Sequence, residues 1–108
     1  METTTGSTDA HAAANVGDVE SLKIIAEKES HQLTAKDANG WAPIHEGARG
    51  GHVDVLRILV EHGADVNERT NQGKGASPLF LAIEAHGKKH AVVNYLRSLD
   101  AQYIEPEL

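Results

Sequence analysis

Seven histidines are the side chains of this 108-residue sequence best suited to chemistry, because imidazole binds metals and exchanges protons near neutral pH. His86 and His90 are four positions apart, a spacing that could place both rings on one face of a helix around a zinc ion. Gly87 lies between them, however, and the stretch from Ala85 to Lys89 is typical of a turn. We therefore expect no metal ligands here, and a histidine-dependent metal-binding protein is only the less favoured alternative.

The other reactive side chains form no catalytic pattern. None of the serines lies in the G-x-S-x-G turn that exposes a nucleophile. The segment Gly73–Ser77 contains Gly, Lys and Ser, but not in the order of a G-x-x-x-x-G-K-[ST] phosphate-binding loop, and we interpret it as a lengthened hairpin. Neighbouring carboxylates such as Glu27 and Glu29 are typical of a solvated surface. The sequence predicts no catalytic residue, no cofactor and no enzyme activity.

Charge and composition exclude further classes of function. The formal net charge is −6, which repels phosphate backbones and anionic lipid, so we expect neither nucleic acid nor a membrane surface as a partner. The longest apolar runs are far shorter than the roughly 20 residues that cross a bilayer. The chain has no cysteine, which suits a reducing compartment. These features favour a cytoplasmic protein, with the nucleus as the other candidate.

The elements that position these residues follow from an internal repeat. Aligned positions include Gly17 with Gly51, His11 with His45 and Leu22 with Leu56 at an offset of 34 residues, and Pro43 with Pro78 at an offset of 35. Three units result, at residues 9–38, 39–71 and 72–104, with residues 1–8 expected to be a disordered lead-in and 105–108 a tail. A unit of this length cannot bury its apolar face alone, so neighbouring units must stack.

Helix signals divide each unit into two helices. We predict helices at residues 9–16, 19–28, 43–49, 54–61, 78–85 and 90–99. Pro43 suits a first helical turn, Gly50 and Gly51 end that helix, and Gly63 lies past the end of the next one. Asp9 is the predicted cap of the first helix. In the second helix, Leu22, Ile24 and Ile25 are expected to form the buried apolar stripe.

The segment from Trp41 to Asn67 resembles one whole ankyrin repeat. It carries Ala-Pro-Ile-His at 42–45, Gly-His at 51–52 and Gly-Ala-Asp-Val-Asn at 63–67, where the family pattern has T-P-L-H, G-H and G-A-D-V-N. The resemblance implies an all-α ankyrin-repeat solenoid of stacked helix-turn-helix units with short β-hairpin fingers. The unequal unit lengths argue against a designed repeat protein.

The resemblance also implies roles for single residues. His45 is expected to bond a backbone group between repeats, a similar structural role is expected for His52, and the hydroxyl of Ser77 to cap a helix. Asn67 is similar to the asparagine that an oxygen-sensing hydroxylase modifies in ankyrin repeats. The alternative for Asn67 is a simple hydrogen bond across its own hairpin.

Members of this family usually bind other proteins on the concave face formed by finger tips and first helices. Carried over by position, that face contains Asn39, Trp41, Glu46, Arg49, Gln72, Lys74, Leu81 and Glu84. Trp41 is either a binding hot spot or a cover for its own hairpin. The predicted function is a monomeric, non-enzymatic protein–protein interaction module, such as an adaptor, inhibitor or targeting domain, whose partner is unknown. The alternative is the ankyrin targeting or regulatory portion of a larger enzyme.

Overall fold

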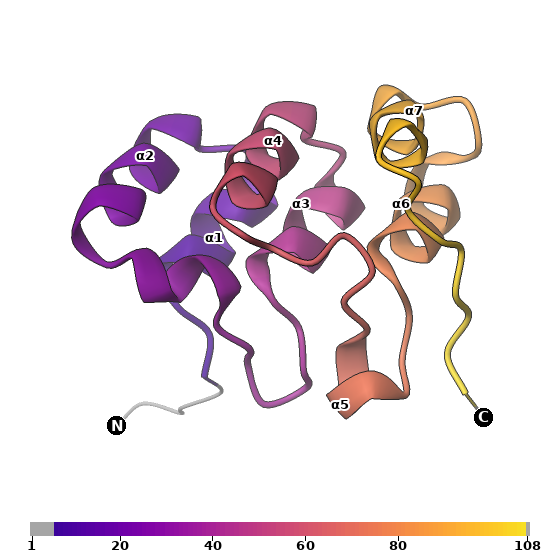
Figure 1. Ribbon diagram of the computed structural model, residues 1–108, viewed down its shortest axis with the longest axis horizontal. Coiled ribbons are helices and arrows are strands. Elements are labelled where there is room, and N and C mark those ends of the chain that lie inside the picture. The colour runs from indigo at the N-terminus through magenta and orange to yellow at the C-terminus, as the bar shows by residue number, and fades with distance from the viewer. Residues whose placement is uncertain (1–5, 108) are drawn as a thin grey trace.

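Three pairs of antiparallel helices stack side by side in the computed structural model, which describes residues 6–107 (Figure 1). The pairs are α1 (Asp9–Val16) with α2 (Val19–Lys28), α3 (Pro43–Gly50) with α4 (Val53–Glu61), and α6 (Pro78–His86) with α7 (Ala91–Ser98). The first helices α1, α3 and α6 form one layer, and α2, α4 and α7 form the other. A 3₁₀ helix, η1 (Ser30–Thr34), and a short segment, α5 (Thr70–Gly73), connect the units.

Proline, glycine and capping side chains determine where the helices begin and end. Pro43 and Pro78 occupy the first turns of α3 and α6, where a missing N–H costs no hydrogen bond. Gly17 and Gly51 follow α1 and α3 with φ angles of 79° and 80°, in the left-handed region that glycine adopts freely. The prediction of Asp9 as a cap was wrong, because the side chain of Thr8 accepts the hydrogen bond from the N–H of His11.

The predicted helix bounds agree with the structure to within a residue. The first two helices are as predicted, α3 and α6 are each one residue longer, α4 begins one residue earlier, and α7 is one residue shorter at each end. The 3₁₀ helix η1 was not predicted. It ends the first unit and buries Leu33, which is 1% exposed.

The core runs continuously through all three units. Ala14, Ala48 and Ala82 are each fully buried at the contacts between first helices, so that these helices approach closely. Larger side chains of the second helices, such as Leu22 and Leu56, fill the space between the layers. The apolar stripe was wrong at Ile24, which is 56% exposed.

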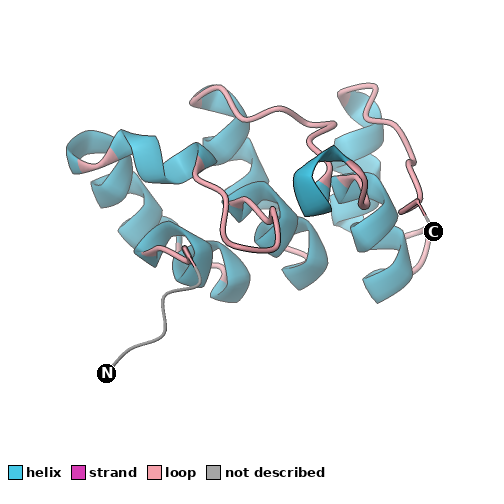
Figure 2. Cartoon of the chain, turned by 90° about the horizontal axis from the view of Figure 1, so that it is seen from below, coloured by secondary structure: helices cyan, strands magenta, loops and turns pink. Residues whose placement is uncertain are grey.

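The fingers between units are turns, and no residue between 6 and 107 is assigned to a strand (Figure 2). Between the first and second units the N–H of Asp37 donates to the carbonyl of Trp41 over 2.8 Å, which closes a hairpin-like loop. In the third finger the N–H of Thr70 donates to the carbonyl of Ala76. Two residues of α5, Asn71 and Gln72, have left-handed φ angles of 50° and 52°, so this segment is a turn at the finger tip.

Residues 101–107 lie without helix or strand against the third unit. The N–H of Ser77 donates to the carbonyl of Ile104, and the N–H of Glu107 donates to the carbonyl of Lys74. This stretch runs beside the third unit in Figure 1. It occupies the side of the third unit where a further finger would follow. No helix within residues 6–107 is long and apolar enough to cross a membrane.

Candidate functional site

A ladder of side-chain hydrogen bonds connects each first helix to the finger that follows it. These bonds hold together the face that is formed by the fingers and the first helices. The Nε2 atoms of His11 and His45 bond the carbonyls of Trp41 and Glu68, each over 2.7 Å. In the third unit Phe80 aligns with His45, and a comparable bond comes from Ser77 at the start of α6, whose hydroxyl donates to the carbonyl of Gln102 over 2.7 Å. The predicted backbone bond of His45 is thereby confirmed, and so is the capping role of Ser77, whose Oγ accepts from the N–H of Phe80.

His45 is held neutral by its surroundings. Burial lowers its pKa, an effect that the bond to the Glu68 carbonyl and the charge of Glu68 partly oppose. Its Nδ1 accepts a hydrogen bond from the N–H of Ala42 over 2.9 Å, so Nε2 carries the proton that is donated to Glu68. Both ring nitrogens are therefore engaged in structural bonds, and neither is free for a metal or a substrate.

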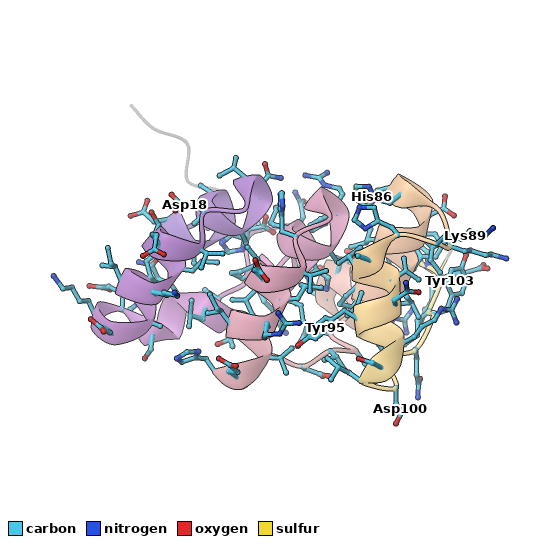
Figure 3. The ribbon with its side chains drawn as sticks, turned by 90° about the horizontal axis from the view of Figure 1, so that it is seen from above. Asp18, His86, Lys89, Tyr95, Asp100 and Tyr103 are labelled. Carbon is cyan, nitrogen blue, oxygen red and sulfur yellow. The ribbon has the colours of Figure 1, made fainter. Side chains whose placement is uncertain are left out.

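Two other histidines link the turns of successive units. The ring of His52 bonds the carbonyl of Asn15 over 3.0 Å, and the ring of His86 bonds the carbonyl of Arg49 over 2.6 Å. The structural role predicted for His52 is confirmed. His86 lies at the end of α6 (Figure 3), with its ring centroid 4.4 Å from that of His90.

The His86 and His90 rings are not part of a larger cluster of side chains that could bind a metal. Within residues 6–107 no group of three or more His, Cys, Asp or Glu side chains is close enough together to hold a metal ion. In addition, His90 Nδ1 accepts from the N–H of Val92 at the start of α7 over 3.0 Å. The two rings thus serve the turn between α6 and α7.

Four of the predicted binding residues line one hollow on the concave face. This hollow is bordered by Asp37, Asn39, Trp41, Glu46 and Arg49. The guanidinium of Arg49 lies 4.8 Å from the centre of the Trp41 ring, and Glu46 accepts a hydrogen bond from Arg49 over 3.2 Å. A planar aromatic ring, a cation and an anion are thus presented together in a shallow site.

The Trp41 ring also covers its own unit. It packs edge-on against His45 with ring centroids 5.7 Å apart, and the side chain is half-buried. Asp37, which the sequence reasoning missed, accepts hydrogen bonds from the N–H groups of Asn39 and Trp41, each over 2.9 Å. An Asp two residues before Asn-Gly is the signal that could have identified this turn.

The other four predicted residues lie on the third unit. Gln72 and Lys74 are exposed on the finger, Glu84 is exposed on α6, and Leu81 is half-buried there. Gln72 Nε2 lies 3.5 Å from the carbonyl of Ala38, which links the second and third fingers. Binding of a partner by these eight residues remains a prediction.

Asn67 lies between the second and third units. Its side-chain oxygen accepts from the N–H of Gln102 over 2.8 Å, so the bond reaches the following unit instead of crossing its own hairpin. The Asn67 N–H donates to Asp65 over 2.8 Å. Hydroxylation of Asn67 remains a prediction, which mass spectrometry of the Asn67 peptide from the native cell would test.

Comparisons with known proteins agree with this geometry. The sequence pattern of the family described as "Ankyrin repeats (3 copies)" matches residues 10–106. The chain is 42% identical over 64 residues to NF-kappa-B inhibitor cactus of Drosophila melanogaster, which covers 59% of this chain and 12% of cactus.

Two further relatives come from other groups of proteins. The chain is 34% identical over 70 residues to 2-5A-dependent ribonuclease of Mus musculus, covering 65% of this chain and 9% of the ribonuclease. An ankyrin repeat-containing protein of Schizosaccharomyces pombe is 49% identical over 47 residues, 44% of this chain and 22% of that protein. The chain thus spans only a small part of these relatives. The stacked helix pairs, the histidine ladder and the match over residues 10–106 together show that the chain belongs to the ankyrin repeat family.

Proposed function

We propose that this protein is a non-enzymatic protein–protein interaction module that binds its partner on the concave face, as an adaptor, inhibitor or targeting domain. Ankyrin repeats are typical protein-interaction modules, and cactus is named as an inhibitor of NF-kappa-B. The partner of this chain is a protein of unknown identity. We further propose that the chain acts as a monomer in the cytoplasm or the nucleus.

The Trp41–Arg49 pair is the observation that carries this proposal. Trp and Arg are the residue types most enriched at binding hot spots, and here they are stacked on one another beside Glu46. Asn15 donates a hydrogen bond to the same Glu46 oxygen over 3.1 Å, so the first and second units are joined at the hollow. A partner that covers the pair would remove a prealigned cation and ring from water. The cation–π attraction becomes stronger once the pair is desolvated.

The chain contains a matched control for this pair. Arg57 lies over the ring of Tyr95 at 5.2 Å and pairs with Asp54, three residues before it, as Arg49 pairs with Glu46. Both arginine side chains are 52% exposed. Arg57, however, belongs to α4, and Tyr95 (Figure 3) belongs to α7, both in the other helix layer.

Affinity purification from extracts of the cell that makes the protein tests the proposal. We expect Trp41→Ala and Arg49→Ala each to weaken capture of the partner by about 2 kcal/mol or more, the usual hot-spot range, while Arg57→Ala captures it as the wild type does. Circular dichroism would show that all three variants remain folded. Equal loss with Arg57→Ala, or normal capture by Arg49→Ala and Trp41→Ala, would contradict a concave-face site.

A second candidate is the targeting or regulatory portion of a larger enzyme. The similarity to part of a ribonuclease supports it, because that protein carries a similar segment within an enzyme. An immunoblot of native extract distinguishes the two. A band near 11.6 kDa would support the free-standing module, and a much larger band would support the portion of a longer protein.

A further inference from the structure

The N-terminal end of the stack exposes an apolar surface away from the concave hollow. Val16 of α1 and Ile24 of α2 are 69% and 56% exposed. They border a groove of about 460 Å³ between the two helices, to which Ile25 also contributes. Figure 1 shows that within residues 6–107 no helix lies beyond α1 and α2 at this end.

A preceding repeat would meet a valine on this face where the second unit presents a glycine to the first. Position 16 corresponds to Gly50 in the second unit, 34 residues later. A Cβ atom at Gly50 would lie 2.8 Å from the carbonyl oxygen of Asn15 in the first unit, closer than real contacts allow. Position 16 carries valine instead, which is larger than both Gly50 and Ala85, the residue at this position in the third unit. A preceding unit would therefore have to stack at a greater distance than the second unit stacks on the first.

The turn after α1 also differs from the turn that joins the second unit to the first. In the second unit, His52 bonds the carbonyl of Asn15 and so joins the two units. The corresponding residue of the first unit is Asp18 (Figure 3). Hydrogen bonds from the Ser21 hydroxyl and N–H lower the pKa of Asp18, so the carboxylate is ionised and has no proton to donate to a carbonyl. The face therefore differs in shape and in charge from the one that the second unit presents to the first.

The groove combines an apolar floor with a carboxylate near each end. Asp9 lies in the first turn of α1 and Asp18 just past the last turn of that helix, and both line the groove. Neither takes part in the ion pairs found among residues 6–107. A second copy of this chain would bring its own carboxylates against these two on a molecule of net charge −6, which disfavours self-association. The two carboxylates favour a partner with basic side chains.

The shape of the groove favours a helix. In the second unit, the equivalent faces of α3 and α4 pack against the helices α1 and α2. A groove between two helices accepts the side-chain ridges of a third one. The volume is at the low end of the ~300–1,000 Å³ of small-molecule sites, so it suits a few side chains of one segment. We propose that the groove bordered by Val16 and Ile24 binds an amphipathic helix of another protein, whose apolar face is flanked by Lys or Arg residues.

NMR titration of the ¹⁵N-labelled chain with a designed helical peptide tests the proposal. The probe carries a leucine stripe flanked by lysines, and a matched peptide carries glutamates in place of the lysines. We expect shifts at Ala12, Val16, Ile24 and Ile25 with the lysine peptide and none with the glutamate peptide. Ile24→Lys should weaken binding about tenfold or more, because an exposed apolar contact is lost and a like charge is added.

Charge variants separate the groove from general electrostatic attraction. Asp18→Asn keeps a good helix cap and removes the charge, so it should weaken binding severalfold. Asp54→Asn removes the same charge from the first turn of α4 outside the groove and should change little. Equal effects of the two substitutions, or equal binding of the glutamate peptide, would overturn the proposal.

Other occupants give distinguishable results. Shifts confined to the hollow around Trp41, or binding abolished by Trp41→Ala, would place the peptide on the concave face and overturn the proposal. Self-association that Ile24→Lys abolishes would identify a second copy as the occupant. Peptide binding that strengthens on removal of residues 1–5 would identify the chain's own start as the occupant. Absence of binding by the lysine peptide at millimolar concentration would overturn the proposal as well.

Discussion

At the scale of single residues, His45 couples the stability of the fold to pH. The folded chain needs the neutral ring, because Nδ1 accepts from Ala42 while Nε2 donates to Glu68. Burial lowers the pKa of His45 below its ordinary value of 6.5. The unfolded chain takes up this proton near pH 6.5 and the folded chain only at lower pH. The contribution of His45 to stability is therefore complete above about pH 6.5 and is lost as the pH falls toward the lower pKa of the folded state.

Urea unfolding of the wild type and of His45→Gln, followed by Trp41 fluorescence at pH 7.5 and at pH 5.5, measures this coupling. We expect His45→Gln to lower the free energy of unfolding by about 1–3 kcal/mol at pH 7.5, because buried backbone groups lose their hydrogen-bond partners. We also expect the free energy of unfolding of this variant to fall less between pH 7.5 and pH 5.5 than that of the wild type. His31→Gln is the control for removal of a histidine from the surface, since the His31 side chain is 76% exposed. An unaltered pH dependence in His45→Gln would assign the coupling to other groups.

The backbone conformation of Gln72 lowers the stability of the folded chain. Its φ of 52° lies in the left-handed region, which costs a residue with a Cβ roughly 1–2 kcal/mol relative to glycine. Gln72→Gly should therefore stabilise the protein by up to about 1 kcal/mol in urea unfolding. Lys74→Gly is the matched control, because Lys74 has a φ of −108° and the substitution should bring no gain. Destabilisation by Gln72→Gly would show that the Gln72 side chain contributes more than the strain costs.

At the scale of elements, the contact of α3 with the first unit depends on Gly50. A methyl group at this position would lie 2.8 Å from the Asn15 carbonyl and 2.7 Å from the ring of His52. We expect Gly50→Ala to destabilise the protein by about 1–3 kcal/mol in thermal or urea unfolding, although alanine has the higher helix propensity. Val16→Ala, at the equivalent position of α1, should be tolerated within about 0.5 kcal/mol. Similar effects of the two substitutions would contradict the asymmetry on which the N-terminal groove depends.

Most elements could be predicted from the sequence because their signals are local. Proline at the start of a helix and glycine after its end determine boundaries within a few residues, and the 34-residue offset transfers them between units. The exposure of Ile24 follows from helix geometry that the expected apolar stripe left out. Two residues after Leu22, it lies about 200° around a helix of 3.6 residues per turn, so it faces away from the core. Only the stacking of units shows that its side has no neighbour within the described residues.

The candidate site was predictable in part. The positions of Asn39, Trp41, Glu46 and Arg49 follow from the repeat pattern, and the structure gathers them around one hollow. The stacking of Arg49 on Trp41 depends on rotamers and on the turn that Asp37 fixes, and neither has a signature in residue spacing. The extended contacts of the last residues with Ser77 also depend on the fold, because these partners are more than 20 residues apart in sequence.

At the scale of the whole molecule, the three units should unfold as one. Each unit contacts only its neighbours, but the core is continuous, and the ladder of His11, His45 and Ser77 ties every first helix to the finger that follows. With so few units, none is stable without the others. A change in the third unit must then lower the stability that a probe in the second unit reports.

Ser77→Ala tests this cooperativity. The hydroxyl of Ser77 donates to Gln102 and accepts from Ile104 and Phe80, so its removal leaves partly buried groups without partners. We expect a loss of about 1–3 kcal/mol. Fluorescence of Trp41 in the second unit and far-ultraviolet circular dichroism of all helices should report one shared urea midpoint, shifted equally in both signals. Ser98→Ala provides the control, because its hydroxyl bonds only the Tyr95 carbonyl on an exposed part of α7. If Ser77→Ala shifts the circular dichroism transition and leaves the Trp41 transition in place, the third unit unfolds separately and the stack is not a single cooperative unit.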